Sequence, residues 1–431
     1  MAKDRNLAIV SILVLSMLIS AEATNSERSY AVVFDAGSTG TRVHVFCFDH
    51  NLQLVPIGNE IELYEAVKPG LSAYGDDPPK AADSIKKLLQ DAQNAVPKAE
   101  QSTTPVTLGA TAGLRLLPGD KSEKILQAVR DLLAGKSSFK FNRTWVTILD
   151  GSQEGSFMWI AINYLLQTLG SDYPNTVGVI DQGGGSMQMA YAVSDEQAKN
   201  APKPIKGEDP YIRKVTLKGK TYHIYVHSYL NYGLLASRTE ILNITRNMNS
   251  PCILKGYDGT YNYSGHTYKA TSPHFGPNFY KCYKIVHKAL KFNQECKHKK
   301  CTFGGVWNGG GGVGQKTLFL ASFFYDMAAQ VGFINSSSLV ARVRPIDFKI
   351  AAYKACQIIY KQAGKKYPKI YASSLPYICM DLVYQYSLLV DGFGILPRQE
   401  ITLVKELKYK SYLIGAAWPL GKAIELASES I

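Results

Sequence analysis

An aspartate followed by a turn of glycines and hydroxyl residues lies near the start of the sequence. Asp35 ends the apolar run 31–34, and small and hydroxyl residues follow it, including Gly37, Ser38, Thr39, Gly40 and Thr41. The glycines let the backbone turn tightly, so that successive N–H groups and hydroxyls converge on one point and favour an anion. The carboxylate of Asp35 would repel that anion unless a divalent cation lies between the two charges. The turn therefore predicts a phosphate and a metal ion together.

A second stretch repeats this order of parts. The apolar residues 177–180 lead into Asp181, and Gly183, Gly184, Gly185, Ser186 and Gln188 follow. Each stretch alone also fits an ordinary hairpin turn, but the pair, with matching acids, predicts a duplicated domain. In such a domain two loops hold one polyphosphate from opposite sides.

A third acidic residue begins a helix. We expect a strand over 145–149 and a helix from residue 150 to Gly170, with Asp150 and Gln153 as a capping box. Glu154 then lies in the first helical turn, where the helix dipole favours its ionised form. Beside a phosphate it could orient and deprotonate a water molecule; elsewhere it would be a routine first-turn glutamate.

The remaining elements are read from periodicity and turn residues. A strand over 105–108 leads into a turn that presents Thr111 and Arg115, and a helix is expected over 81–95. Further on we expect a hairpin over 211–226, a helix over 230–245 and a hairpin over 256–269 that carries four tyrosines. A helix over 318–329 would bear Tyr325, as core or as a platform for a nucleobase.

A glycine-rich run, 309–317, invites comparison with a P-loop. Gln315 stands where that motif needs a glycine, and no clear strand precedes the run. We interpret it as a mobile loop.

The first residues have the pattern of a secretory signal peptide, which we assign to residues 1–23. Lys3 and Arg5 precede an apolar run over 7–19, and residues 21–23 supply an A-x-A cleavage site. A membrane anchor is the alternative, but the run is shorter than the ~20 residues a spanning helix needs. The mature protein is therefore expected to have no membrane span and to be extracellular or in the secretory lumen. Four glycosylation sequons, at Asn142, Asn243, Asn262 and Asn335, fit that route.

The net charge of +13 favours polyanions as partners. The charge is spread along the chain, so the composition does not support nucleic-acid recognition. Lys281, Lys284, Lys288 and Lys291 would share one helical face. That face either binds a calmodulin-like partner or an anionic surface, or is simply solvated.

Seven cysteines leave at least one unpaired. Cys47 alternates with Val43 and Val45 on one side of a strand and is expected to be a free, buried thiol. The other six can form three disulfides in an oxidising compartment, with fifteen possible pairings. Our preferred pairing joins Cys252 to Cys282, Cys296 to Cys301 and Cys356 to Cys379.

Five segments, in this order, resemble the five signature regions of the apyrases, the nucleoside triphosphate diphosphohydrolases. They are Asp35–Arg42, Gly109–Arg115, Gly151–Gly155, Asp181–Gln188 and Ala416–Gly421. The soluble plant apyrases look most similar, especially the legume proteins of the lectin nucleotide phosphohydrolase type. The resemblance spans nearly the whole mature chain.

The resemblance implies an α/β fold of the actin-like ATPase superfamily, with two ribonuclease-H-like domains and the active site in the cleft between them. Residues 30–150 and 411–431 would form the N-terminal domain. Residues 151–410 would form the C-terminal domain, with disulfide-bearing insertions.

The family also implies roles for residues that match its motifs. Asp35 and Asp181 would hold a Ca²⁺ or Mg²⁺ ion through its waters. Glu154 would be the catalytic base, and Thr111, Ser186 and Gln188 would help to place the attacking water. The phosphates and nucleotide would be bound by Ser38, Thr39, Gly40, Thr41, Ala112, Gly183, Gly184, Gly185 and Tyr325, of which Tyr325 matches the aromatic position that stacks the base. Leu234 departs from the pattern, because an arginine that flanks the base often stands there.

The implied activity is hydrolysis of nucleoside tri- and diphosphates such as ATP and ADP to the monophosphate, by a secreted, monomeric hydrolase. One alternative is an intracellular sugar kinase or chaperone ATPase of the same broad fold, against which the signal peptide, sequons and cysteines argue. Another is a glycan-binding lectin or receptor that retains the fold, with or without the hydrolase activity. The tyrosines of the 256–269 hairpin would offer such a protein stacking surfaces.

Overall fold

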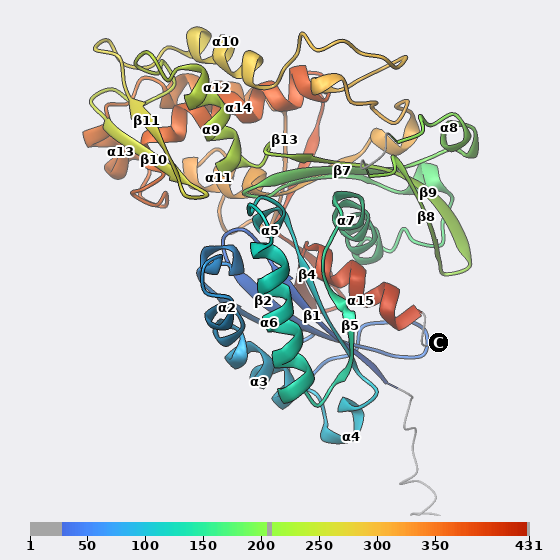
Figure 1. Ribbon diagram of the computed structural model, residues 1–431. Coiled ribbons are helices and arrows are strands. Elements are labelled where there is room, and N and C mark those ends of the chain that lie inside the picture. Colours follow the sequence, from blue (N-terminus) through green and yellow to red (C-terminus); the bar gives the residue numbers. More distant parts are fainter. Residues whose placement is uncertain (1–27, 205–208, 429–431) are drawn as a thin grey trace, which may run out of the picture.

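The computed structural model describes residues 28–204 and 209–428. The predicted signal peptide, residues 1–23, and the last three residues of the predicted N-terminal domain lie outside these described residues. Two β-sheets, each covered by helices, make up the body of the molecule (Figure 1).

The first sheet has the strand order β3-β2-β1-β4-β5. Its strands are β1 (Ser29–Ala36), β2 (Thr41–Phe48), β3 (Leu63–Val67), β4 (Pro105–Ala110) and β5 (Lys140–Ile148). β1 is antiparallel to β2 and parallel to β4, and β4 is parallel to β5. One face is covered by α2 (Pro78–Ser84), α3 (Lys86–Ala95) and α6 (Lys121–Lys136). The helix predicted over 81–95 is thus two helices, which meet at Ile85.

The second sheet repeats this arrangement. Its central strands run in the order β9-β7-β6-β12-β14, and they are β6 (Gly178–Gln182), β7 (Ser186–Val193), β9 (Lys220–Leu230), β12 (Leu318–Ser322) and β14 (Ile401–Val404). β6 is antiparallel to β7 and parallel to β12, as β1 is to β2 and β4. β8 (Ile212–Leu217) and β13 (Val340–Val343) extend the two edges. The predicted duplication is therefore confirmed in the strand order.

Two helices, α7 (Gly151–Leu165) and α15 (Trp418–Ser428), pack against each other between the sheets (Figure 1). α7 is buried along almost its whole length, because one apolar core joins it to the inner faces of both sheets. A Cβ at Gly421 of α15 would clash with the carbonyl oxygen of Phe157, so the glycine lets the two helices touch. The chain thus returns at its end to the first sheet, whose β1 contacts α15.

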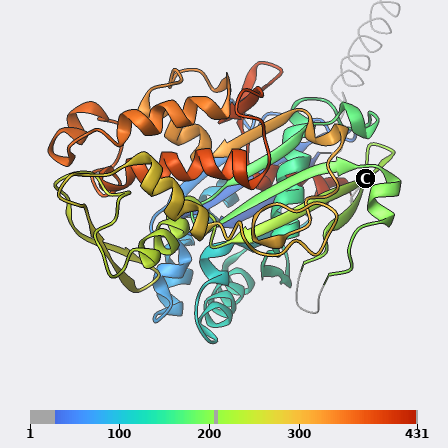
Figure 2. The same ribbon diagram turned by 90° about the horizontal axis from the view of Figure 1, so that it is seen from above.

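Helices cover the outer face of the second sheet. They include α9 (Leu234–Ile244), α10 (Phe279–Ala289), α11 (Phe323–Val331), α12 (Pro345–Ala355) and α14 (Ile378–Ser387). In Figure 2, helical segments coloured yellow to red gather beside the long green strands. The smaller elements are α4 (Lys98–Gln101), α5 (Ala112–Arg115), α8 (Asp195–Lys199), α13 (Tyr360–Lys366), β10 (Asp258–Tyr263), β11 (His266–Thr271), β15 (Glu406–Tyr409) and β16 (Tyr412–Gly415).

Both predicted hairpins form, as β8–β9 and β10–β11. The helix predicted over 230–245 begins at Leu234, because β9 continues to Leu230. The helix predicted over 318–329 is wrong in its first part. Residues 318–322 form strand β12, which is held in the centre of the sheet between β6 and β14. A short apolar run of this kind does not distinguish a central strand from a buried helix.

The glycine-rich run is a loop, as predicted, but its contacts do not support the expected mobility. Tyr191 Oη donates a 2.5 Å hydrogen bond to Asn308 O and accepts one from Gly311 N, and Gln197 Nε2 donates to Gly311 O at 2.7 Å. The four glycines 309–312 all have positive φ, a conformation that favours glycine.

The structure joins the cysteines in the preferred pairing, Cys252–Cys282, Cys296–Cys301 and Cys356–Cys379. Cys47 is buried and free. Among the described residues, no helix has the length and apolar character needed to cross a membrane.

Candidate active site

The two glycine-rich turns meet between the two sheets. A Cβ at Gly184 would lie 2.8 Å from Ser38 Oγ and 3.5 Å from Thr39 Cγ2, so the turns are in contact. Within the described residues, the N–H groups of Gly184 and Gly185 donate to no other residue. They remain available as donors to an anion, as the sequence predicts.

Backbone N–H groups at the start of α9 donate hydrogen bonds to the carbonyl groups of the second turn. Leu234 N donates to Gly183 O at 2.9 Å, and Leu235 N and Ala236 N donate to Gly184 O at 3.0 and 2.9 Å. This contact needs a glycine at residue 233, where a Cβ would lie 2.5 Å from the carbonyl carbon of Gly184. The start of α9 therefore fixes the position of the second turn.

Each turn brings one aspartate to the same region. Arg42 Nη1 lies 3.2 Å from Asp35 Oδ2, and Ser322 Oγ donates a 2.6 Å hydrogen bond to Asp181 Oδ1. Burial raises the pKa of Asp181 to about 6, the bond from Ser322 opposes this, and the charge of Asp35 adds to it. The two carboxylates therefore repel each other across the site.

This donor set fits a hard divalent cation. Two neighbouring carboxylates are stabilised by a positive charge between them, and Ca²⁺ and Mg²⁺ prefer oxygen ligands. The described residues contain no cluster of three or more histidine, cysteine or acidic side chains placed to hold a metal. Two carboxylates without further protein ligands suit an ion that keeps several of its waters.

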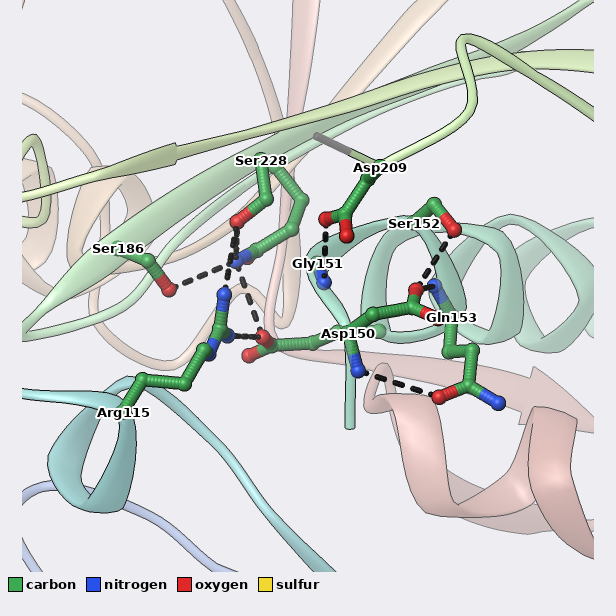
Figure 3. Close-up of polar contacts among 10 residues, drawn as sticks. Arg115, Asp150, Gly151, Ser152, Gln153, Ser186, Asp209 and Ser228 are labelled. Carbon is green, nitrogen blue, oxygen red and sulfur yellow. Dashed lines mark hydrogen bonds and ion pairs between the residues drawn. The ribbon is translucent and has the colours of Figure 1, made fainter. Parts of the chain in front are cut away.

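Glu154 lies in the first turn of α7, and the expected capping box is present. Asp150 Oδ1 accepts a 2.6 Å hydrogen bond from Gln153 N, and Gln153 Oε1 accepts one of 3.1 Å from Asp150 N (Figure 3). Asp209 Oδ2 accepts a further 2.9 Å bond from Gly151 N. These caps hold the start of α7, and with it Glu154, against the second sheet.

The environment of Glu154 suits a base near neutral pH. Its side chain is buried, which raises the pKa of its carboxyl to about 7, while the Arg115 guanidinium lowers it and the charges of Asp181 and Asp35 raise it. Arg115 Nη2 and Gln188 Nε2 both donate to the same carboxylate oxygen, Oε2. Oε1 accepts no hydrogen bond from any described residue, which leaves it free to accept a proton from water.

Gln188 links Glu154 to two hydroxyl groups. Its Nε2 lies 3.1 Å from Glu154 Oε2, 2.7 Å from Ser186 Oγ and 3.0 Å from Ser228 Oγ. Arg115 Nη1 also donates to Ser228 Oγ, at 3.3 Å (Figure 3). The four side chains Glu154, Gln188, Ser186 and Ser228, with Arg115, form one polar network beside the second turn.

The short helix α5 reaches the second turn from the first sheet. A Cβ at Gly185 would lie 2.8 Å from Ala112 Cβ, and one at Gly113 would lie 2.8 Å from Ser38 Cα. Thr111, which precedes α5, donates from its N–H to Ala36 O at 3.2 Å. Thr111 therefore lies beside the first turn, and Ala112 beside the second.

The surroundings of two predicted site residues, Tyr325 and Thr41, bear on their predicted roles. Tyr325 is 3% exposed and packs in the core of the C-terminal helices, and its hydroxyl lies 3.0 Å from Ser338 O. The structure does not present its ring as a stacking surface. Thr41 is fully buried at the start of β2, and its hydroxyl has no partner among the described residues. Leu234, the departure from the family pattern, is buried in the core under the second turn.

Sequence reasoning noted Arg115 without a site role, and it missed Ser228 and Ser322. Arg115 ends the predicted turn 109–115, so its motif carried a signal. Ser228 has no local signal, because it meets Gln188 only through the pairing of β7 with β9. Ser322 lies at the end of β12 and contacts Asp181 from there. Sequence periodicity had predicted a helix for this segment.

The duplicated sheet with one site between its halves defines an α/β fold of the actin-like ATPase class, with two ribonuclease-H-like domains. Solved structures agree. The fold resembles a nucleoside triphosphate hydrolase from Neospora caninum, with a TM-score of 0.66 and 14% identity over 99% of this chain and 97% of that one. A Ppx/GppA family protein from Aquifex aeolicus has a TM-score of 0.51 and 11% identity over 94% and 99% of the two chains.

Residues 21–431 match the GDA1/CD39 (nucleoside phosphatase) family, and the chain belongs to it. The chain is 55% identical to apyrase 1 of Arabidopsis thaliana, over 97% of this chain and 90% of the relative. It is 54% identical to probable apyrase 2 of rice, over 98% and 93% of the two chains. It is 53% identical to a nucleoside-triphosphatase of pea, over 93% and 88%. The resemblance to plant apyrases is therefore confirmed, and the protein is an enzyme of this nucleoside phosphatase family.

Proposed function

We propose that the protein is an apyrase, which hydrolyses nucleoside tri- and diphosphates such as ATP and ADP to the monophosphate and phosphate. The observation that carries this proposal is the meeting of the two turns beside Glu154, whose Oε1 accepts no hydrogen bond from the described part of the chain. Two sets of N–H donors around one buried base suit attack of water on a phosphate better than transfer to a bulky acceptor. Relatives named as apyrases and as a nucleoside-triphosphatase support the substrate class.

The site residues have separate roles in the proposed reaction. The two turns, with Ser38, hold the phosphates by hydrogen bonds, and Glu154 Oε1 takes a proton from water as its oxygen bonds to the terminal phosphorus. The bond from that phosphorus to the bridging oxygen breaks, and the shortened nucleotide leaves with that oxygen. Gln188 and Ser186 hold the water in line.

Asp35 and Asp181 would hold a Ca²⁺ or Mg²⁺ ion through its waters. Such an ion, when bound, neutralises negative charge on the phosphate oxygens. Arg42 and Ser322 keep the two carboxylates in place. Because the turns contact a flexible phosphate chain and not the base, either a β- or a γ-phosphate can occupy the reactive position.

Thr111 and Ala112 complete the phosphate side of the site from α5 in the proposed N-terminal domain, residues 30–150 with 411–431. We also propose that the protein is secreted after cleavage of its signal peptide and that it is a monomer. The disulfides are compatible with an oxidising compartment. Glycan binding remains a prediction; the rings of Tyr257 and Tyr261 pack against Tyr377, which leaves less of the 256–269 hairpin for stacking.

The decisive experiment measures phosphate release from ATP, ADP and AMP with Ca²⁺, Mg²⁺ or EDTA. We expect release from ATP and ADP, none from AMP, and none in EDTA. Glu154→Gln should retain nucleotide binding and lose about 10²- to 10⁴-fold in kcat, the usual contribution of a general base. Glu196→Gln, at an exposed surface glutamate, is the matched control. Hydrolysis of AMP, or near-normal kcat in Glu154→Gln, would contradict the proposal.

A further inference from the structure

The β10–β11 hairpin places a tyrosine at the second turn. Tyr263 ends β10, and the turn residues Ser264 and Gly265 follow with positive φ. A Cβ at Gly185 would lie 3.2 Å from Tyr263 Oη and 2.8 Å from Ala112 Cβ. In Figure 1 the tip of this hairpin points from the helices of the second sheet toward α5. The hairpin tip, the second turn and α5 therefore meet at one place.

The hairpin is anchored by the tyrosine two residues earlier. Tyr261 Oη donates a 2.9 Å hydrogen bond to Leu235 O in α9, and its ring packs edge to face on Tyr377 at 5.0 Å. The rings of Tyr261 and Tyr263 stack at 6.3 Å between centroids. Because the start of α9 also binds the second turn, the position of Tyr263 is coupled to that turn by direct contacts.

The hydroxyl of Tyr263 has no hydrogen-bond partner in the described part of the chain. The hydroxyl of Tyr261 donates a hydrogen bond to the carbonyl of Leu235, whereas Tyr263 Oη makes no hydrogen bond to any described residue. Burial, with Tyr261 and Tyr268 nearby, raises the pKa of Tyr263 to about 12, so it carries its proton at neutral pH. The neutral hydroxyl of Tyr263 is therefore a hydrogen-bond donor beside Gly185 that has no acceptor among the described residues.

We propose that Tyr263 is a further substrate-binding residue, whose hydroxyl donates a hydrogen bond to a phosphate oxygen of the nucleotide held by the turn Gly183–Ser186. The inference rests on the proposed function, because it takes the bound anion to be a nucleoside polyphosphate. It adds a side-chain donor from the β10–β11 hairpin to a phosphate site built from the two turns and α5. It also gives the hairpin a role other than glycan stacking.

The test is a binding measurement with a hydrolysis-resistant ATP analogue and the chain carrying Tyr263→Phe. Loss of one hydrogen bond to a charged group predicts a rise in Kd of about 10-fold or more, with the thermal midpoint unchanged. Tyr268→Phe removes a hydroxyl from the neighbouring strand and should leave Kd unchanged. AMP serves as the second ligand, and its weaker binding should respond less than that of the analogue.

An unchanged Kd for the analogue in Tyr263→Phe would overturn the inference. So would an equal loss for AMP and the analogue, since the contact would then be to the nucleoside or the α-phosphate and not to the phosphates that the turn Gly183–Ser186 holds in the analogue. If Tyr263→Phe lowers the thermal midpoint, Tyr263→His, which keeps a ring and a donor, decides the matter: restored affinity supports the hydrogen bond, and continued loss refutes it. Absence of phosphate release by the unmodified protein would defeat the proposed function, whereas the binding comparison would still decide the role of Tyr263.

Discussion

Replacement of Arg115 by methionine should shift the pH dependence of hydrolysis. Arg115 is the positive charge in direct contact with Glu154, and it holds the pKa of that carboxyl down against burial and the charges of Asp181 and Asp35. With the charge removed, the pKa of Glu154 should rise above about 7. Glu154 acts as a base only when ionised, so its activity is lost as pH falls through the pKa and recovered as pH rises above it.

The size of the effect follows from this titration. With a pKa of about 7, roughly half of Glu154 is ionised at pH 7 and about a tenth at pH 6. A rise of one unit in the variant would leave about a tenth ionised at pH 7 and half at pH 8. For a rise of one unit, Arg115→Met should therefore lose about 5-fold in kcat at pH 7, and most of this loss should disappear near pH 9.

The assay is kcat for ATP between pH 5.5 and 9.5 at saturating substrate and a fixed Mg²⁺ or Ca²⁺ concentration, so that any effect of the cation is shared by both proteins. Arg143→Met removes an exposed arginine that pairs with Asp131. This variant should leave the acidic midpoint of the kcat profile against pH unchanged. An acidic midpoint in Arg115→Met equal to that of the unmodified protein would refute the reasoning. In that case Arg115 would act on the substrate and not on the base.

Two further predictions concern what supports the second turn. Arg238 and Asp381 form a bidentate ion pair between α9 and α14, with N–O distances of 2.8 and 2.6 Å, and the pair is almost fully buried. Arg238→Met should lower the free energy of unfolding by about 3–5 kcal/mol, because Asp381 stays buried without its partner. Urea denaturation measures this change. Adding Asp381→Leu should restore most of that loss, and a double variant as unstable as the single one would contradict this account. Gly233→Ala places a Cβ against Gly184, and should lower kcat/KM for ATP about 100-fold by displacing the turn. Gly135→Ala, where a Cβ meets open space, is the control, and equal kcat/KM in the two variants would show that the turn tolerates the methyl group.

The sequence was informative wherever the chemistry is local in the chain. Asp35 and Asp181 each stand directly before their own glycine turn, and Asp150 and Gln153 lie one helical turn apart, so short-range patterns predicted both loops and the cap that holds Glu154. The duplication followed from the repeat of one such pattern. Each of these features depends on contacts within a few residues.

The missed features depend on pairing between distant segments. Ser228 joins Gln188 because β9 pairs with β7 in one register, and a shift of one residue would turn it to the other face. Tyr325 was assigned to a helix that was expected to begin at residue 318. That helix begins at Phe323, and Tyr325 packs in the core, which is one of the two roles that the sequence left open. Tyr263 reaches the site from a hairpin whose direction no local pattern gives.

The two halves explain why a duplicated scaffold has one base. In β1–β2 the residue paired with Asp35 is Arg42, and in β6–β7 the residue paired with Asp181 is Gln188. Arg42 forms an ion pair with its aspartate, whereas Gln188 extends to Glu154. The helices between the sheets differ in the same way. The fourth residue of α7 is Glu154, and the fourth residue of α15 is Gly421, which the contact with α7 keeps small. A carboxylate at residue 421 would clash with α7 and be buried at the interface, so packing between the two helices restricts the base to one half of the molecule.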